Sequence, residues 1–186
     1  MIAGLARKHR LRVDPPLIGS KATKSAIKSE WGRYSTIHLA AHAFYDNLNP
    51  LYSGIVLAQD SPDSPQNGIL EAREILDQDL SANLVILSAC DTARGAIYGG
   101  EGPVGLSWAL FVAGTPASVV TQWRVADQSS ATFMQSFYRR WGFGMPGAGN
   151  KSKSIALQLA QENLLKSTGY SHPHYWAPFV MIGDSR

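Results

Sequence analysis

A run of four aliphatic residues at positions 84–87 (Leu-Val-Ile-Leu) constrains the fold of this chain more than any other feature. Two small residues follow the run, and then comes Cys90, the only cysteine among 186 residues. A continuous aliphatic run this short is typical of a strand buried on both faces, as in parallel sheets. Cys90 would then lie at the carboxyl end of a central strand, where open α/β sheets carry their functional residues.

A lone cysteine at that position has two interpretations. It is a candidate nucleophile, because a thiolate reacts readily with carbonyl carbon when a neighbouring group lowers its pKa. It is also compatible with a small buried apolar residue, which is what most free cysteines are. The run alone does not decide between them.

Composition narrows the class of protein. Hydrophobic residues make up 45% of the chain and charged residues 17%, which is typical of a single globular domain. A net charge of +3 is too small to predict a nucleic-acid partner, and no apolar run approaches the roughly 20 residues of a membrane span. One cysteine cannot form an internal disulfide, so we expect a reducing, cytoplasmic location. We expect residues 1–16 to form a basic linker or edge segment and residues 17–186 to form the domain.

Strands and helices are expected to alternate along the chain. The predicted strands are residues 35–42, 54–58, the run from 84, 117–123 and 179–182. The predicted helices are residues 21–30, 70–76, 103–112, 127–141 and 151–166, with Asp127 as an N-cap, Gly114 as a C-cap and residues 142–149 as a linker. This alternation predicts an α/β fold with a mainly parallel sheet and helices on both faces.

His42 is the natural partner for Cys90, because it ends the strand predicted at 35–42. If the two strands are neighbours, both residues lie at the same edge of the sheet. A histidine there can act as the general base toward a thiol and then as the general acid toward a leaving amine. His38 is the competing base, but it lies four residues earlier, roughly 13 Å back along an extended strand. We therefore expect His38 to be a buried, hydrogen-bonded core residue.

Three other patterns resemble known kinds of site, but each departs from what its site requires. His172 and His174 flank a proline, but two histidines without a third ligand do not make a zinc site. Residues 100–105 match G-x-G-x-x-G with Asp127 further on, although the glycines do not directly follow a strand as a dinucleotide site requires. Ser107 lies in a G-x-S-x-A sequence, but we expect it inside a helix rather than at a nucleophile elbow.

Taken together, several segments resemble the CHAT domain, a caspase-like cysteine peptidase family related to separases and caspases. The likeness runs from about residue 17 to 186, with the family's order and spacing. The segments that carry it are 37–42 (Ile-His-Leu-Ala-Ala-His), 87–92 (Leu-Ser-Ala-Cys-Asp-Thr), 100–106, 113–117, 123–127 and 175–179.

The resemblance implies a caspase-hemoglobinase-like α/β/α sandwich with a His42/Cys90 dyad. It also implies an oxyanion hole made of the backbone N–H groups of Cys90 and Ala43. Ala43 departs from the family, which usually has glycine there, and an alanine would be strained if the position needs a positive φ. Asp91 could border a specificity pocket, hold a cation or cap a turn, and Asp127 could border the pocket or cap its helix.

The function that we expect is therefore a cysteine endopeptidase that cleaves a protein partner through a thioester and needs no metal or other cofactor. It would be the effector domain of a longer protein, with a regulatory helical-repeat region outside this chain. Neither nucleic acid nor a membrane is an expected partner. Two alternatives remain: a catalytically inactive caspase-like scaffold or interaction domain, and a nucleotide-binding α/β domain.

Overall fold

The computed structural model describes residues 2–8, 11–46, 48–61, 67–88, 90–91, 102–144 and 151–186, with the backbone alone at 8, 90–91 and 102–104. The chain forms two compact units. We call residues 17–124 and 182–184 the sheet unit, and residues 1–16, 125–181 and 185–186 the helical unit.

The central sheet is mainly parallel. Its strand order is β1 (Thr36–Leu39), β5 (Leu84–Leu87), β7 (Ala117–Thr121) and β8 (Phe179–Gly183). β5 runs parallel to both β1 and β7, and all four of its residues are buried. Just after β8, the Asp184 N–H donates to the Pro116 carbonyl at 2.8 Å, which places the end of β8 beside the start of β7. The fold is α/β, as the alternation of elements predicted.

A second, smaller sheet has the order β4 (Ile69–Glu71), β3 (Gly54–Val56), β2 (His42–Phe44) and β6 (Cys90–Asp91). β3 is antiparallel to β4 and to β2, whereas β2 and β6 are parallel. The strand predicted at 35–42 is therefore wrong in extent, since β1 ends at Leu39 and β2 begins at His42. The chain leaves the first sheet there because β2 takes up hydrogen bonding to β3 in the second.

The helices of the sheet unit are η1 (Gly19–Lys21), α2 (Lys24–Glu30), η2 (Trp31–Arg33), η3 (Pro50–Tyr52), α3 (Ala72–Leu76) and α4 (Gly102–Val112). α4 contacts α3, η3 and β7. Gly105 permits the contact with η3, because a Cβ at this position would lie 3.0 Å from Pro50 Cβ and from the Pro50 carbonyl oxygen. Gly114 follows α4 with a φ of +109°, a conformation that favours glycine.

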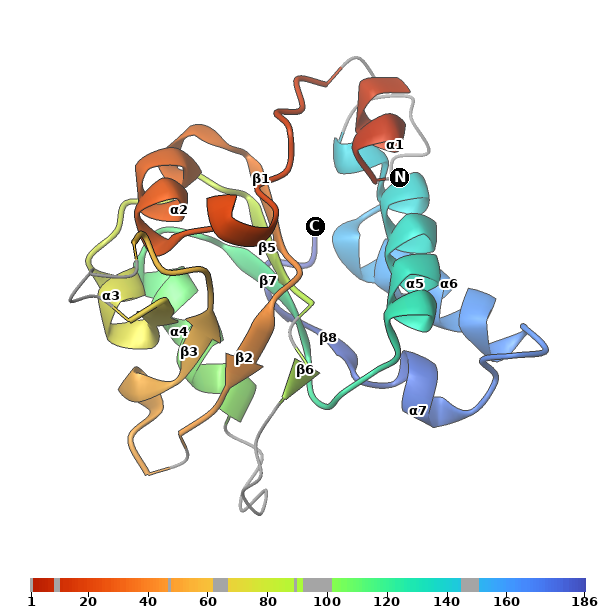
Figure 1. Ribbon diagram of the computed structural model, residues 1–186. Coiled ribbons are helices and arrows are strands. Elements are labelled where there is room, and N and C mark those ends of the chain that lie inside the picture. Colours follow the sequence, from red (N-terminus) through yellow and green to blue (C-terminus); the bar gives the residue numbers. More distant parts are fainter. Residues whose placement is uncertain are drawn as a thin grey trace. The chain divides into compact units, whose positions relative to one another are not determined.

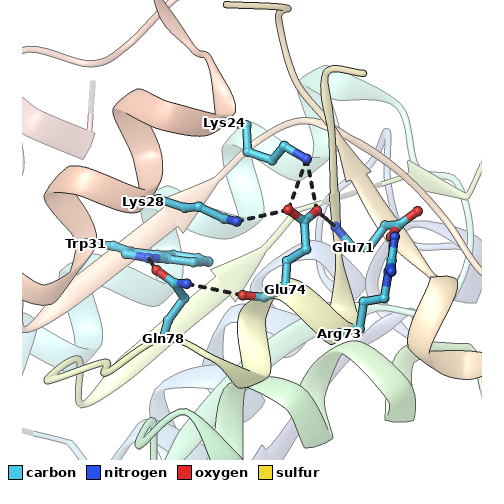
Figure 2. Close-up of polar contacts among 7 residues, drawn as sticks. All are labelled: Lys24, Lys28, Trp31, Glu71, Arg73, Glu74 and Gln78. Atoms are coloured by element: carbon cyan, nitrogen blue, oxygen red, sulfur yellow. Dashed lines mark hydrogen bonds and ion pairs between the residues drawn. The ribbon is translucent and has the colours of Figure 1, made fainter. Parts of the chain in front are cut away.

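An ion-pair cluster joins α2 to α3 (Figure 2). Lys24 Nζ lies 3.0 Å from both carboxylate oxygens of Glu74, and Lys28 Nζ lies 2.9 Å from Oε1. The same carboxylate accepts the Glu71 backbone N–H at 3.2 Å and so completes a capping box at the start of α3. The Lys24 side chain is only 6% exposed, so Glu74 supplies the charge that makes its burial tolerable.

The helical unit contains α1 (Ile2–Lys8), α5 (Asp127–Trp141), η4 (Gly142–Gly144), α6 (Lys153–Leu165) and α7 (Pro173–Trp176). α5 packs against α6, and both contact α7. Within the segment expected to be a linker, α1 contacts α5 and buries Ala6. The core of this unit is aromatic, and Phe133 stacks on Phe179 with ring centroids 3.8 Å apart. The apolar stripe predicted for residues 127–141 is buried as expected; its members are Phe133, Met134, Phe137 and Tyr138.

Candidate active site

The His42–Cys90 relationship is set by the backbone. In the parallel pair of β2 and β6, His42 lies opposite Cys90 and Ala43 lies opposite Asp91. Figure 1 shows the two strands side by side within the sheet unit. Neighbouring strands of a sheet are about 4.8 Å apart, so residues distant in the sequence become immediate neighbours.

The strand pair β1–β5 of the central sheet has the same register as the pair β2–β6. β1 and β5 pair Thr36 with Leu84 and Leu39 with Leu87, and the Ser88 N–H donates to the Leu39 carbonyl at 2.9 Å. The separation along the chain from 36 to 84 is the same as that from 42 to 90, so both strand pairs share one register. The pairing of β1 with β5 therefore sets the register in which β2 and β6 meet.

The two histidines of this segment differ in environment. His42 is exposed. His38 is part-buried, its Nε2 lies 3.3 Å from Ser88 Oγ, and burial lowers its pKa to about 4. His38 is therefore neutral at physiological pH, whereas the His42 side chain is open to solvent. The contact between His38 and Ser88 was not predicted, since only the pairing of β1 with β5 brings the two residues together.

Ala43 is fully buried and lies in β2 between Ile55 of β3 and Asp91 of β6. Among the described residues, Phe143 is the non-glycine residue with a positive φ, so Ala43 keeps the extended backbone of its strand. An alanine adopts this conformation without strain. Ala43 thus does not distort the backbone next to His42.

Asp91 occupies the second position of β6, directly after Cys90. Asp127 is exposed and is the first residue of α5, in the helical unit. The prediction that Asp127 is the N-cap is wrong by one residue, because the N-cap is Ala126 and has no side-chain capping hydrogen bond. A carboxylate in the first turn still favours the helix through its dipole.

The other candidate sites have structural explanations. His172 is the N-cap of α7, where its Nδ1 accepts the His174 N–H at 3.2 Å. Ser107 is buried inside α4, as predicted, and its Oγ accepts from Ser118 Oγ at 3.2 Å. Of the glycine-rich segment, Gly100 and Glu101 lie outside the described residues, while Gly105 serves the packing of α4.

The described residues contain neither a metal-binding cluster nor a membrane-spanning helix. In that part of the chain, no three histidine, cysteine, aspartate or glutamate residues gather closely enough to hold a metal ion. Nor does any helix within those ranges have the length and apolar character needed to cross a membrane.

Known proteins support the family suggested by the sequence. Tetratricopeptide repeat protein 28 of Mus musculus is 26% identical to the chain over 204 aligned positions, and its Homo sapiens counterpart is 26% identical over 199. Each alignment covers 91% of this chain but only 8% of the relative, so the chain spans a small part of these proteins. The family model described as the CHAT domain matches residues 1–184. The chain therefore belongs to the caspase-like CHAT domain family.

Proposed function

We propose that this CHAT domain is a cysteine endopeptidase in which Cys90 is the nucleophile and His42 the general base. The observation that carries the proposal is the pairing of these two residues in one parallel register. A thiol and an imidazole on adjacent strands can exchange a proton, and the resulting thiolate is the reactive form of cysteine.

The reaction would proceed in two acyl-transfer steps. The Cys90 thiolate attacks the scissile carbonyl carbon, and the carbonyl electron pair moves to oxygen. Collapse of this intermediate breaks the C–N bond, and the His42 imidazolium gives its proton to the leaving amine. His42 then takes a proton from water, whose oxygen attacks the thioester and releases the carboxylate product and the Cys90 sulfur.

The oxyanion of each intermediate needs hydrogen-bond donors. We assign this role to the backbone N–H groups of Cys90 and Ala43, and such a donor is typically worth about 100-fold or more in rate. Alanine retains the backbone N–H that glycine would supply, and Ala43 holds an unstrained extended conformation. This conformation weakens the alternative of an inactive scaffold, which rested on the loss of that glycine.

Substrate recognition and regulation involve groups other than the dyad. Asp91 adjoins the nucleophile in the sequence and is our candidate for recognising a basic substrate side chain. The substrate would be a protein in a reducing, cytoplasmic compartment that keeps Cys90 a free thiol. Because both relatives are named for tetratricopeptide repeats, we propose that a helical-repeat region outside these residues controls the domain.

The direct experiment is to incubate the protein with a library of proteome-derived peptides and to identify new amino termini by mass spectrometry. Cys90→Ala is the test variant and His38→Asn the control, since both change one residue of the sheet unit. New termini should appear with the wild type and with His38→Asn and be lost with Cys90→Ala. Unchanged cleavage by folded Cys90→Ala would rule out the proposed nucleophile.

A further inference from the structure

A cavity of about 460 Å³ lies in the helical unit, and its described lining comes from α5, from α6 and from the segment just before α6. Arg139 and Arg140 line it from the last turn of α5, and Lys151 lines it from the segment just before α6. Its volume falls within the range of small-molecule sites, about 300–1,000 Å³, and exceeds what a single phosphate ion occupies.

The charge of this cavity is uncompensated. No acidic residue is among its described lining, and no ion pair in the described part of the chain involves Arg139, Arg140 or Lys151. The sequence between Gly144 and Lys151 (Met-Pro-Gly-Ala-Gly-Asn) also carries no charge. Three cations gathered at one cavity repel one another, and an anion bound among them would remove that repulsion.

Two hydrogen bonds position Arg140 and Lys151 at the cavity. The Arg140 Nε donates to Ser136 Oγ at 3.3 Å, one turn earlier on the same helix, and so orients the guanidinium. The Lys151 backbone N–H donates to the Arg140 carbonyl at 3.4 Å, which keeps Lys151 beside the end of α5. The arrangement is thus partly built before any ligand arrives.

Apart from Leu159, the rest of the described lining is polar, and no aromatic residue belongs to it. Thr132, Gln135 and Asn163 add side-chain hydroxyl and amide groups, and Leu159 is the one apolar residue of the described lining. A cavity without an aromatic ring offers no surface on which a nucleotide base could stack. The chemistry favours a compact anion with several oxygens over a flat heterocycle.

We propose that this cavity is a binding site for a polyphosphate group, meaning a small ligand with two or more linked phosphates. Arginine matches phosphate oxygens with paired N–H donors, and lysine adds a compact positive charge. The proposal is independent of the His42/Cys90 dyad, because its residues lie in the helical unit and its readout is binding. The phosphate chain can come from inorganic polyphosphate or from a nucleoside triphosphate.

The test is isothermal titration of the whole chain with sodium tripolyphosphate, orthophosphate and ATP. Arg139→Gln is matched with Arg124→Gln, and Lys151→Gln with Lys21→Gln, since the control residues are exposed cations of the sheet unit. We expect one tripolyphosphate per chain, about tenfold weaker binding in each cavity variant and less than about a twofold change in each control. Orthophosphate should bind more weakly than tripolyphosphate.

The ATP titration distinguishes the two sources of the phosphate chain, inorganic polyphosphate and a nucleoside triphosphate. Equal affinity for ATP and tripolyphosphate means that the phosphate chain alone is recognised, and markedly tighter ATP binding assigns the site to a nucleotide. The proposal is overturned if tripolyphosphate does not bind, or if the controls lose as much affinity as the cavity variants. It is also overturned if a phosphoserine peptide binds at the cavity while tripolyphosphate does not.

Discussion

His42 and Cys90 are opposite one another in the parallel ladder of β2 and β6, although 47 residues separate them in the sequence. The pairing of β1 with the fully buried strand β5 holds the register that produces this arrangement. The proposed dyad therefore depends on the packing of the central sheet, and damage to that packing should affect both stability and reactivity.

Ala43→Gly tests whether alanine limits the proposed oxyanion hole. Because Ala43 already has an unstrained extended backbone, glycine should not improve the site. We expect the rate of labelling by a peptidyl acyloxymethyl ketone to stay within about twofold of the wild type, while the free energy of unfolding falls by about 1 kcal/mol. A large increase in labelling rate would mean that the alanine distorts the site after all.

His38→Asn tests the structural role of the second histidine. Burial lowers the pKa of His38 to about 4, below the value of about 6.5 in the unfolded chain, so the unfolded state binds the proton more readily. The stability that neutral His38 contributes is present above pH 6.5 and is lost as the pH falls toward 4. Between pH 7.5 and pH 5, urea unfolding of the wild type should lose about 1–2 kcal/mol more than that of His38→Asn. Equal losses in the two proteins would contradict the burial of a neutral imidazole.

Glu74→Gln tests the cluster in Figure 2. Partial burial acts to raise the pKa of Glu74, but hydrogen bonds from Lys28 and Lys24 outweigh it and lower this pKa to about 2. The variant leaves Lys24 buried without a counter-charge, so we expect a loss of about 2–3 kcal/mol by chemical denaturation at pH 7. In the wild type this contribution is present above pH 4.5 and is lost as the pH falls toward 2.

The matched control is Glu162→Gln, which breaks an exposed pair with Lys166 and should cost less than about 0.5 kcal/mol. Similar losses in both variants would show that burial of Lys24 does not set the strength of the cluster.

Gly114→Ala tests the turn after α4. Its φ of +109° disfavours alanine, and the added Cβ would lie 2.7 Å from the Leu80 carbonyl oxygen. We expect a loss of about 2–4 kcal/mol in thermal or urea unfolding. Gly169→Ala is the control, because no atom lies within 4 Å of the place where its methyl group would stand and its φ is not positive, so its stability should change by less than about 0.5 kcal/mol. A neutral Gly114→Ala variant would contradict the close approach to Leu80.

Sequence patterns within a single segment predicted the elements whose conformation depends on neighbouring side chains. The aliphatic run of residues 84–87 forms β5, Gly114 follows α4 with a positive φ, and the apolar stripe of residues 127–141 is buried in α5. In each case a few neighbouring side chains determine the conformation. The family also followed from the sequence, because its motifs are collinear along the chain.

Features that depend on partners distant in the sequence were not predictable. The break between β1 and β2 arises because β2 pairs with β3, and the start of the helix predicted at 70–76 became β4 for the same reason. The cavity beside Arg139 has no sequence signature, because its cations come from two segments separated by uncharged residues. Pairing and cavities are tertiary properties, and a single sequence carries only weak signals of them.

The most direct test of the dyad is the alkylation rate of Cys90 by iodoacetamide as a function of pH, in the wild type, His42→Ala and His38→Asn. The account predicts an apparent thiol pKa well below about 8.5 in the wild type and in His38→Asn, and a return toward 8.5 in His42→Ala. It is contradicted if His42→Ala leaves the pH profile unchanged, or if Cys90 reacts only after the protein is denatured.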